Sequence, residues 1–109
     1  MEVESDPAFL LGVLGGMGPL ATVDFLAKLI AATPAAGDVD HVPLVAASIP
    51  QIPSRVAAIL AGGASPIPAL IGARDRLLAA GATLLAMPCN TAHHWYDDLA
   101  RGIDVPFLH

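Results

Sequence analysis

The sequence predicts an α/β fold, in which a small parallel sheet of about four strands is flanked by helices. Two observations predict it. Short apolar runs alternate along the chain with longer segments whose apolar residues recur at helical spacing. Glycine and proline stand at most of the junctions between these segments. Because strand and helix alternate throughout, we expect parallel strands joined by right-handed crossovers.

The chain begins with a strand–helix pair. Residues 9–14 (FLLGVL) are a short apolar run that ends at a glycine turn, as a buried parallel strand does. Residues 19–33 form the expected helix, and Pro19 suits its first turn. Its apolar residues at helical spacing predict an amphipathic helix with one face made of Leu20, Val23, Ala27 and Ile30.

A second strand over residues 41–48 is followed by a loop that prolines stiffen, IPQIPSR. A short helix over residues 54–61 follows, with Ser54 as its expected N-cap, and then a turn with the sequence GGASP. These features predict a second strand–helix unit.

The rest of the chain repeats the alternation. A helix over residues 66–81 ends at a glycine, and residues 82–87 form the third expected strand. A further helix runs from about residue 91 to 101, and residues 105–109 (VPFLH) begin a fourth strand. No covering helix follows that strand, so either the edge of the sheet is bare or the chain has been cut, and we favour the cut.

We therefore expect three parts: a disordered or extended tail at 1–8, a domain at 9–104 and a strand start at 105–109. With 109 residues the chain is one domain at most. Hydrophobic residues make up 55% and charged residues 14%, so such a chain is expected to pack against another surface.

Several classes of function fit the composition poorly. A net charge of −5 argues against nucleic acid, which needs a basic face. Glycine and proline interrupt the uncharged stretches, so no membrane segment is expected. The acidic start MEVESDP lacks the basic region of a signal peptide, which predicts a cytoplasmic location. A single cysteine builds neither an internal disulfide nor a thiolate metal cage, and no metal site is expected.

Three loops fall where ligands bind in open parallel sheets, at the carboxyl ends of the strands. They are GGMGP after the first strand, IPQIPSR after the second and PCNT after the third. The topology alone predicts that these loops lie close together.

The loop PCNT contains Cys89, the only cysteine of the chain. At the start of a helix, free backbone N–H groups and the helix dipole favour a thiolate or a substrate carboxylate. Asn90 and Thr91 add side-chain donors beside the thiol. Alternatively, Cys89 is a small buried hydrophobic residue and its neighbours only cap the helix. Both interpretations stay open at this point.

The loop GGMGP also has two interpretations. Gly16, Gly18 and Ala21 match the spacing of the dinucleotide-binding fingerprint. Pro19, however, removes an amide from the turn, and no acidic residue ends the second strand. The alternative is a tight turn that needs glycine, with amides free for a smaller anion.

Two further residues offer chemistry. Arg55 could pair with a carboxylate through two parallel hydrogen bonds, or could be an ordinary solvated arginine. His93 could activate Cys89 as a general base, although it lies about one turn further along the expected helix. Packing or surface exposure is the alternative for His93.

Taken together, three stretches resemble the aspartate/glutamate racemase family. They are GVLGGMGPLATVDFLAKL, DVDHVPLVAASIPQIPSR and MPCNTAHHWYDDL, in this order. The resemblance runs from about Leu11 to the last residue and covers the amino-terminal half of the family's pattern.

The resemblance implies a racemase that uses no cofactor and no metal. The family fold has two similar, Rossmann-like domains related by pseudo-symmetry, with a small acidic amino acid, aspartate or glutamate, bound between them. Each half provides one thiol for proton transfer, and Cys89 matches the cysteine of the first half. Residues that match substrate-binding positions are Met17, Gln51, Arg55, Asn90 and Thr91.

The second cysteine would come from a missing second domain or from a homodimer partner. Two alternatives follow. The chain could be an inactive fragment that binds weakly or associates with a partner. It could instead belong to a related isomerase of the hydantoin racemase or maleate isomerase type.

Overall fold

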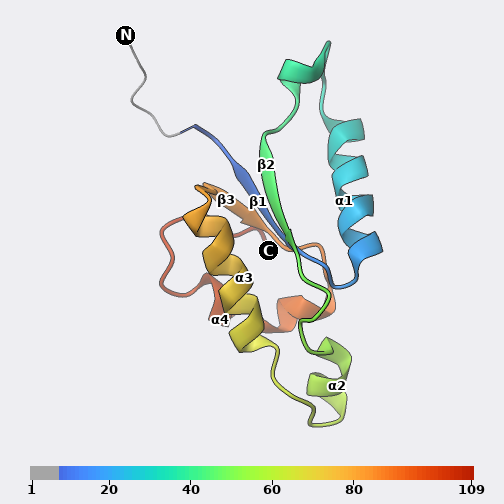
Figure 1. The fold of residues 1–109 in the computed structure, drawn as a ribbon, viewed down its shortest axis with the longest axis vertical. Coiled ribbons are helices and arrows are strands. Elements are labelled where there is room, and N and C mark those ends of the chain that lie inside the picture. The colour runs from blue at the N-terminus through green and yellow to red at the C-terminus, as the bar shows by residue number, and fades with distance from the viewer. Residues whose placement is uncertain (1–7) are drawn as a thin grey trace.

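A computed structural model describes residues 8–109; the expected tail at 1–8 therefore lies almost wholly outside the described residues. The described part is an α/β fold built on three parallel strands (Figure 1). The strands are β1 (Leu11–Gly15), β2 (Leu44–Ser48) and β3 (Leu84–Ala86), in the spatial order β2-β1-β3. Gly12 of the central strand pairs with Val45 on one side and Leu85 on the other. The predicted fold class is confirmed.

The expected fourth strand is reduced to one parallel bridge, between Leu85 and Phe107. The Leu85 N–H donates to Pro106 O at 3.0 Å, and the Leu108 N–H donates to Leu85 O at 2.8 Å. Because β3 has three residues and Pro106 has no N–H, the ladder does not extend further. The 105–109 segment nevertheless lies beside β3.

Helices cover both faces of the sheet (Figure 1). One face is covered by α1 (Pro19–Ala32), and the other by α3 (Ile67–Ala79) and α4 (Tyr96–Ala100). The short α2 (Arg55–Leu60) begins as predicted, since Ser54 Oγ accepts a hydrogen bond from the Ala57 N–H at 3.1 Å. After α3 the chain turns at Gly81, whose φ of 98° lies in the left-handed region. A short 3₁₀ turn, η1 (Asp38–Asp40), precedes β2.

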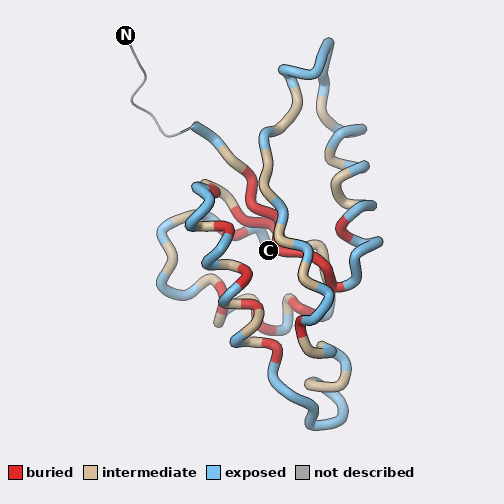
Figure 2. Tube along the Cα trace, in the orientation of Figure 1, coloured by how far each residue is buried: buried red, intermediate tan, exposed pale blue. Residues whose placement is uncertain are grey.

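Side chains of β1 alternate between two apolar cores. Leu11 and Val13 point toward α1, where they pack with Phe25, Leu26 and Leu29. Leu14 points to the other face and joins a larger cluster that includes Leu70, Leu77, Leu85 and Leu99. All five residues of β1 are buried, as the path of this strand in Figure 2 shows. The central strand thus holds both layers of helices.

The apolar stripe predicted on α1 does not face the sheet. Leu20, Val23 and Ile30 are 83%, 59% and 56% exposed, and Ala27 is exposed as well. A second stripe on the same helix, of Thr22, Phe25, Leu26 and Leu29, makes the contact with the sheet. The helix is therefore apolar on two faces, and only one of them is covered in the described residues.

The helix expected over 91–101 is instead two short pieces. Residues Thr91–Trp95 form a 3₁₀ turn, η2, and α4 follows from Tyr96. The break lies at Trp95, whose φ of −105° and ψ of 18° depart from α-helical values. Its side chain is buried in the larger core, so packing of Trp95 fixes the point at which the chain changes direction.

Within residues 8–109, each helix is too short or too polar to cross a lipid bilayer.

Candidate active site

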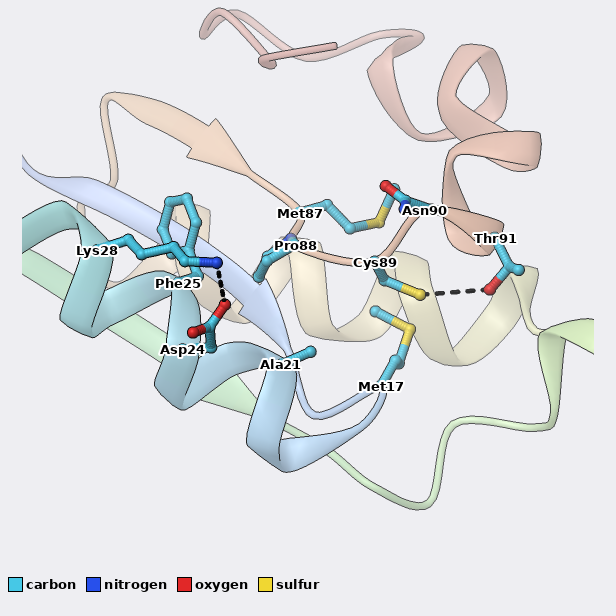
Figure 3. Close-up of a pocket in the computed structure, with 10 residues that line it drawn as sticks. All are labelled: Met17, Ala21, Asp24, Phe25, Lys28, Met87, Pro88, Cys89, Asn90 and Thr91. Carbon is cyan, nitrogen blue, oxygen red and sulfur yellow. Dashed lines mark hydrogen bonds and ion pairs between the residues drawn. The ribbon is translucent and has the colours of Figure 1, made fainter.

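The loops after β1 and β3 border one open pocket of about 570 Å³ (Figure 3). The two strands are neighbours and parallel, so their carboxyl ends bring these loops together. The first turns of α1 form the third wall. The lining residues are Met17, Ala21, Asp24, Phe25, Lys28, Met87, Pro88, Cys89, Asn90 and Thr91.

The glycine turn after β1 is shaped by its contacts with β2 and α1. Gly16 has a φ of 96°, and a Cβ at this position would overlap with the backbone nitrogen of Ile49. The Gly16 N–H donates to the Oγ1 of Thr22 at 2.8 Å, and Thr22 is buried. This amide is therefore bonded within the protein rather than turned toward a phosphate. The next residue, Met17, is 5% exposed and lines the pocket.

Cys89 lies at the pocket wall, half-buried, in a tight turn after β3. The Cys89 N–H donates to Met87 O at 2.9 Å, which closes a three-residue turn around Pro88. Its Sγ lies 3.4 Å from the Oγ1 of Thr91, and Figure 3 shows the sulfur directed along the pocket toward that hydroxyl. The thiol packs against the core on one side and reaches the pocket on the other.

The expected helix dipole at Cys89 is not present in the described structure. Asn90 and Thr91 open the 3₁₀ turn η2 rather than a long α-helix, so few peptide dipoles align toward the sulfur. Both residues are exposed at the pocket, and Asn90 O accepts a hydrogen bond from the His93 N–H at 3.2 Å. Donors beside the thiol therefore come from side chains and the first amides of this turn.

Gln51 and Arg55 do not line the pocket. Gln51 is exposed in the loop after β2. The Nη1 of Arg55 donates to the backbone oxygens of Ile52 and Pro53, at 3.0 and 3.1 Å. Their contact with a substrate stays a prediction, while Met17, Cys89, Asn90 and Thr91 are brought together.

His93 does not pair with the thiol. Its Nε2 lies 2.8 Å from Met87 O, and because a carbonyl oxygen only accepts, Nε2 carries the proton. The hydrogen-bond partner of Cys89 Sγ is Thr91. The alternative in which His93 activates Cys89 directly is thus not the arrangement in this structure.

Sequence reasoning missed the wall that α1 contributes. Ala21, Asp24, Phe25 and Lys28 follow one another at helical spacing on the side of α1 next to the glycine turn. Lys28 Nζ and Asp24 Oδ2 form an ion pair at 2.7 Å, and Lys28 is the only cation among the lining residues. The spacing of this charged pair after a glycine turn was the available signal.

Comparisons with known proteins identify the family of this chain. Residues 14–109 match the model of the family described as Asp/Glu/Hydantoin racemase. The chain belongs to this family. It is 30% identical to the broad specificity amino-acid racemase RacX of Bacillus subtilis (strain 168), over 92% of this chain.

Two solved structures of racemase type are also similar. The aspartate racemase of Picrophilus torridus superposes with a TM-score of 0.86 at 37% identity, over 94% of this chain. An aspartate racemase homologue from Pyrococcus horikoshii OT3 has a TM-score of 0.73 at 27% identity, over 93% of this chain. The chain spans 45% of the Bacillus protein and 43% and 44% of these two structures. It therefore corresponds to about half of its relatives.

Proposed function

We propose that this chain provides one half of an amino-acid racemase site, in which Cys89 exchanges the α-proton of an acidic amino acid. The observation that carries the proposal is the pocket itself. It holds the only thiol of the chain beside the hydroxyl of Thr91 and the amide of Asn90. Membership in the racemase family supports this assignment of the pocket.

The chemistry requires two groups on opposite faces of the α-carbon. The Cys89 thiolate takes the α-proton and becomes a thiol, and the C–H electron pair stays on the substrate as a carbanion. Donors around the substrate carboxylate stabilise this charge, and the side chains of Asn90 and Thr91 are placed to donate. A second thiol then delivers a proton to the other face. In the proposed mechanism thiols alone move the protons.

The second thiol comes from outside the described residues. We propose that residues 9–104 are the first domain, and that 105–109 lead into a second domain that closes the site. A homodimer partner is the other source of a facing thiol. A cytoplasmic location, expected from residues 1–7, stays a prediction.

The proposed substrate is aspartate or glutamate. The two solved structures are an aspartate racemase and an aspartate racemase homologue, and the Bacillus relative is a broad specificity amino-acid racemase. Lys28 is the cation among the lining residues and, although it is ion-paired with Asp24 at 2.7 Å, it suits a distal carboxylate. The family description also includes hydantoin racemases, so the assay panel contains a hydantoin and neutral amino acids.

Exchange of the α-proton in D₂O tests the role of Cys89. A single thiol can remove and return a proton on one face, so the chain alone is expected to incorporate deuterium into aspartate with retained configuration. Cys89→Ser, which changes one atom, is expected to lower this rate by about 100-fold or more. Racemisation follows only when a second thiol is supplied. Equal deuterium incorporation by the wild type and Cys89→Ser would refute the proposal.

A second candidate is a chain that binds dicarboxylic amino acids without turnover. It is favoured by the single cysteine and by the coverage of about half of each relative. In that case aspartate protects Cys89 from iodoacetamide, while no deuterium enters the substrate. The two assays on one preparation separate the candidates.

A further inference from the structure

The backbone oxygen of Met87 accepts two hydrogen bonds. One comes from the Cys89 N–H at 2.9 Å and the other from Nε2 of His93 at 2.8 Å. Met87 is buried, with 4% of its surface exposed, and both donors to its oxygen come from the protein. The first bond closes the turn around Pro88, whose fixed φ suits the central position of such a turn. The second ties the turn to η2.

The imidazole of His93 is itself held in place by aromatic neighbours. It lies nearly parallel to the ring of Tyr96, with an interplanar angle of 9° and a centroid separation of 6.0 Å. The ring of His109 lies 5.8 Å away on a tilted plane. The hydroxyl of Tyr96 donates to Phe107 O, which anchors this cluster to the 105–109 segment. The His93 donor is therefore fixed relative to the Cys89 turn.

We propose that His93 is a positioning residue for Cys89: its Nε2–H holds the Met87 carbonyl and so fixes the turn that presents the thiol to the pocket. It acts through the backbone and does not exchange a proton with the substrate. The thiol stays half-buried and directed toward Thr91 because the turn cannot relax away from η2. The consequence for catalysis rests on the proposed function, but the positioning itself does not.

Three variants separate the hydrogen bond from the packing of the ring. His93→Gln keeps a donor near the position of Nε2 but loses the ring. His93→Phe keeps a ring for Tyr96 and loses the donor. His94→Phe is the matched control, because the neighbouring His94 is exposed and contacts the side chain of Trp95. Circular dichroism and urea unfolding verify that each variant folds.

The readout is the rate at which iodoacetamide alkylates Cys89, the only thiol, so each rate reports one site. His93→Phe is expected to raise the rate about five-fold, as the loss of one hydrogen bond frees the turn. His93→Gln and His94→Phe should stay within about two-fold of the wild type. An unchanged rate in His93→Phe, or an equal rise in His93→Gln, overturns the proposal.

A measurement on the unmodified chain covers the case in which His93→Phe fails to fold. In ¹⁵N-labelled protein, His93 should be the Nε2–H tautomer, and its bonded proton should exchange slowly. An Nδ1–H tautomer overturns the proposal. Alkylation and tautomer need no turnover. A chain that shows both results without α-proton exchange therefore disproves the proposed racemase role and keeps the positioning role. In an active protein, His93→Phe lowers kcat for α-proton exchange and leaves KM unchanged.

Discussion

The loops after β2 and β3 both leave the carboxyl end of the parallel sheet, but their polar side chains are used differently. After β2, Arg55 at the start of α2 donates to two carbonyls of the preceding loop, and the hydroxyl of Ser54 caps α2. In the loop after β3, a carbonyl is held by His93, which lies outside that loop. Cys89 and Thr91 therefore remain at the pocket.

This difference indicates when a polar side chain of a loop can bind a ligand: another residue must supply the hydrogen bonds that the loop backbone needs. Every buried carbonyl and amide in a loop needs a partner. The loop after β2 meets part of that need with the guanidinium of Arg55, the first residue of α2, and this guanidinium then has less capacity for a substrate. The loop after β3 receives its donor from His93 of η2, so the side chains of Cys89 and Thr91 are not needed for this bond. Position at the carboxyl end of the sheet therefore does not by itself decide which side chain can bind a ligand.

The largest difference between the two loops should appear when a hydroxyl is removed from each. Thr91→Val is expected to lower α-proton exchange by about 100-fold, because a donor near the developing charge is lost. Ser54→Ala should leave the exchange rate unchanged and lower the free energy of unfolding by about 1 kcal/mol, the usual cost of a lost N-cap. Deuterium incorporation and urea unfolding measure the two effects.

Equal exchange rates in Thr91→Val and the wild type would show that the loop after β3 holds no catalytic donor at this position. A reduced exchange rate in Ser54→Ala would show that the loop after β2 reaches the substrate. Either result removes the distinction between the loops.

The glycine turn after β1 contacts the start of the loop after β2. A substitution in this turn is expected to have the next largest effect. Gly16→Ala places a Cβ against the backbone of Ile49, at the start of the loop after β2, and forces a left-handed φ on alanine. We expect the free energy of unfolding to fall by about 2 kcal/mol. Gly72→Ala is the control: Gly72 lies in α3 with open space around it, and alanine should stabilise by about 0.5–1 kcal/mol. Urea denaturation that gives the same sign for both variants contradicts the argument.

The element order was predictable from the sequence because each strand and helix carries its own period. The first three strands, the Ser54 cap and the turn at Gly81 were found at their predicted places, with ends shifted by a few residues, while the fourth strand is a single bridge. The spacing of apolar residues did not predict the buried face where two faces of one helix are both apolar. Helix α1 has two apolar stripes, and the sequence does not indicate which one the sheet covers.

The site was predictable to the extent that strand ends determine it. Met17, Cys89, Asn90 and Thr91 come together because β1 and β3 are neighbours. The helix expected after Cys89 was wrong in kind, because five residues are too few to distinguish a 3₁₀ turn from an α-helix by spacing. The positioning role proposed for His93 could not be predicted from the sequence, because it depends on a hydrogen bond to a backbone oxygen six residues earlier.

Arg55 offers a direct test of the loop after β2. Arg55→Met keeps the aliphatic stem and removes two hydrogen bonds to backbone oxygens. The free energy of unfolding is expected to fall by about 1 kcal/mol. Protection of Cys89 from iodoacetamide by aspartate should stay within about two-fold of the wild type. The guanidinium is already bonded to backbone oxygens, so its loss should change substrate binding little. A larger loss of protection would show that Arg55 reaches the substrate, as the family resemblance implies.

The smallest effect is expected at the α1 wall of the pocket, where Lys28 and Asp24 form an exposed ion pair. Lys28→Met should change the free energy of unfolding by less than about 0.5 kcal/mol, because an exposed pair at this spacing contributes little. Its effect on binding should be larger than its effect on stability and specific to acidic ligands, because Lys28 is the only cation among the lining residues. Protection of Cys89 by aspartate should weaken about three-fold at low salt, and protection by alanine should not change. Asp24→Asn, which releases Lys28 from its partner, should strengthen protection by aspartate. If both variants affect aspartate and alanine equally, the α1 wall does not distinguish acidic from neutral substrates, and that choice is made outside the described residues.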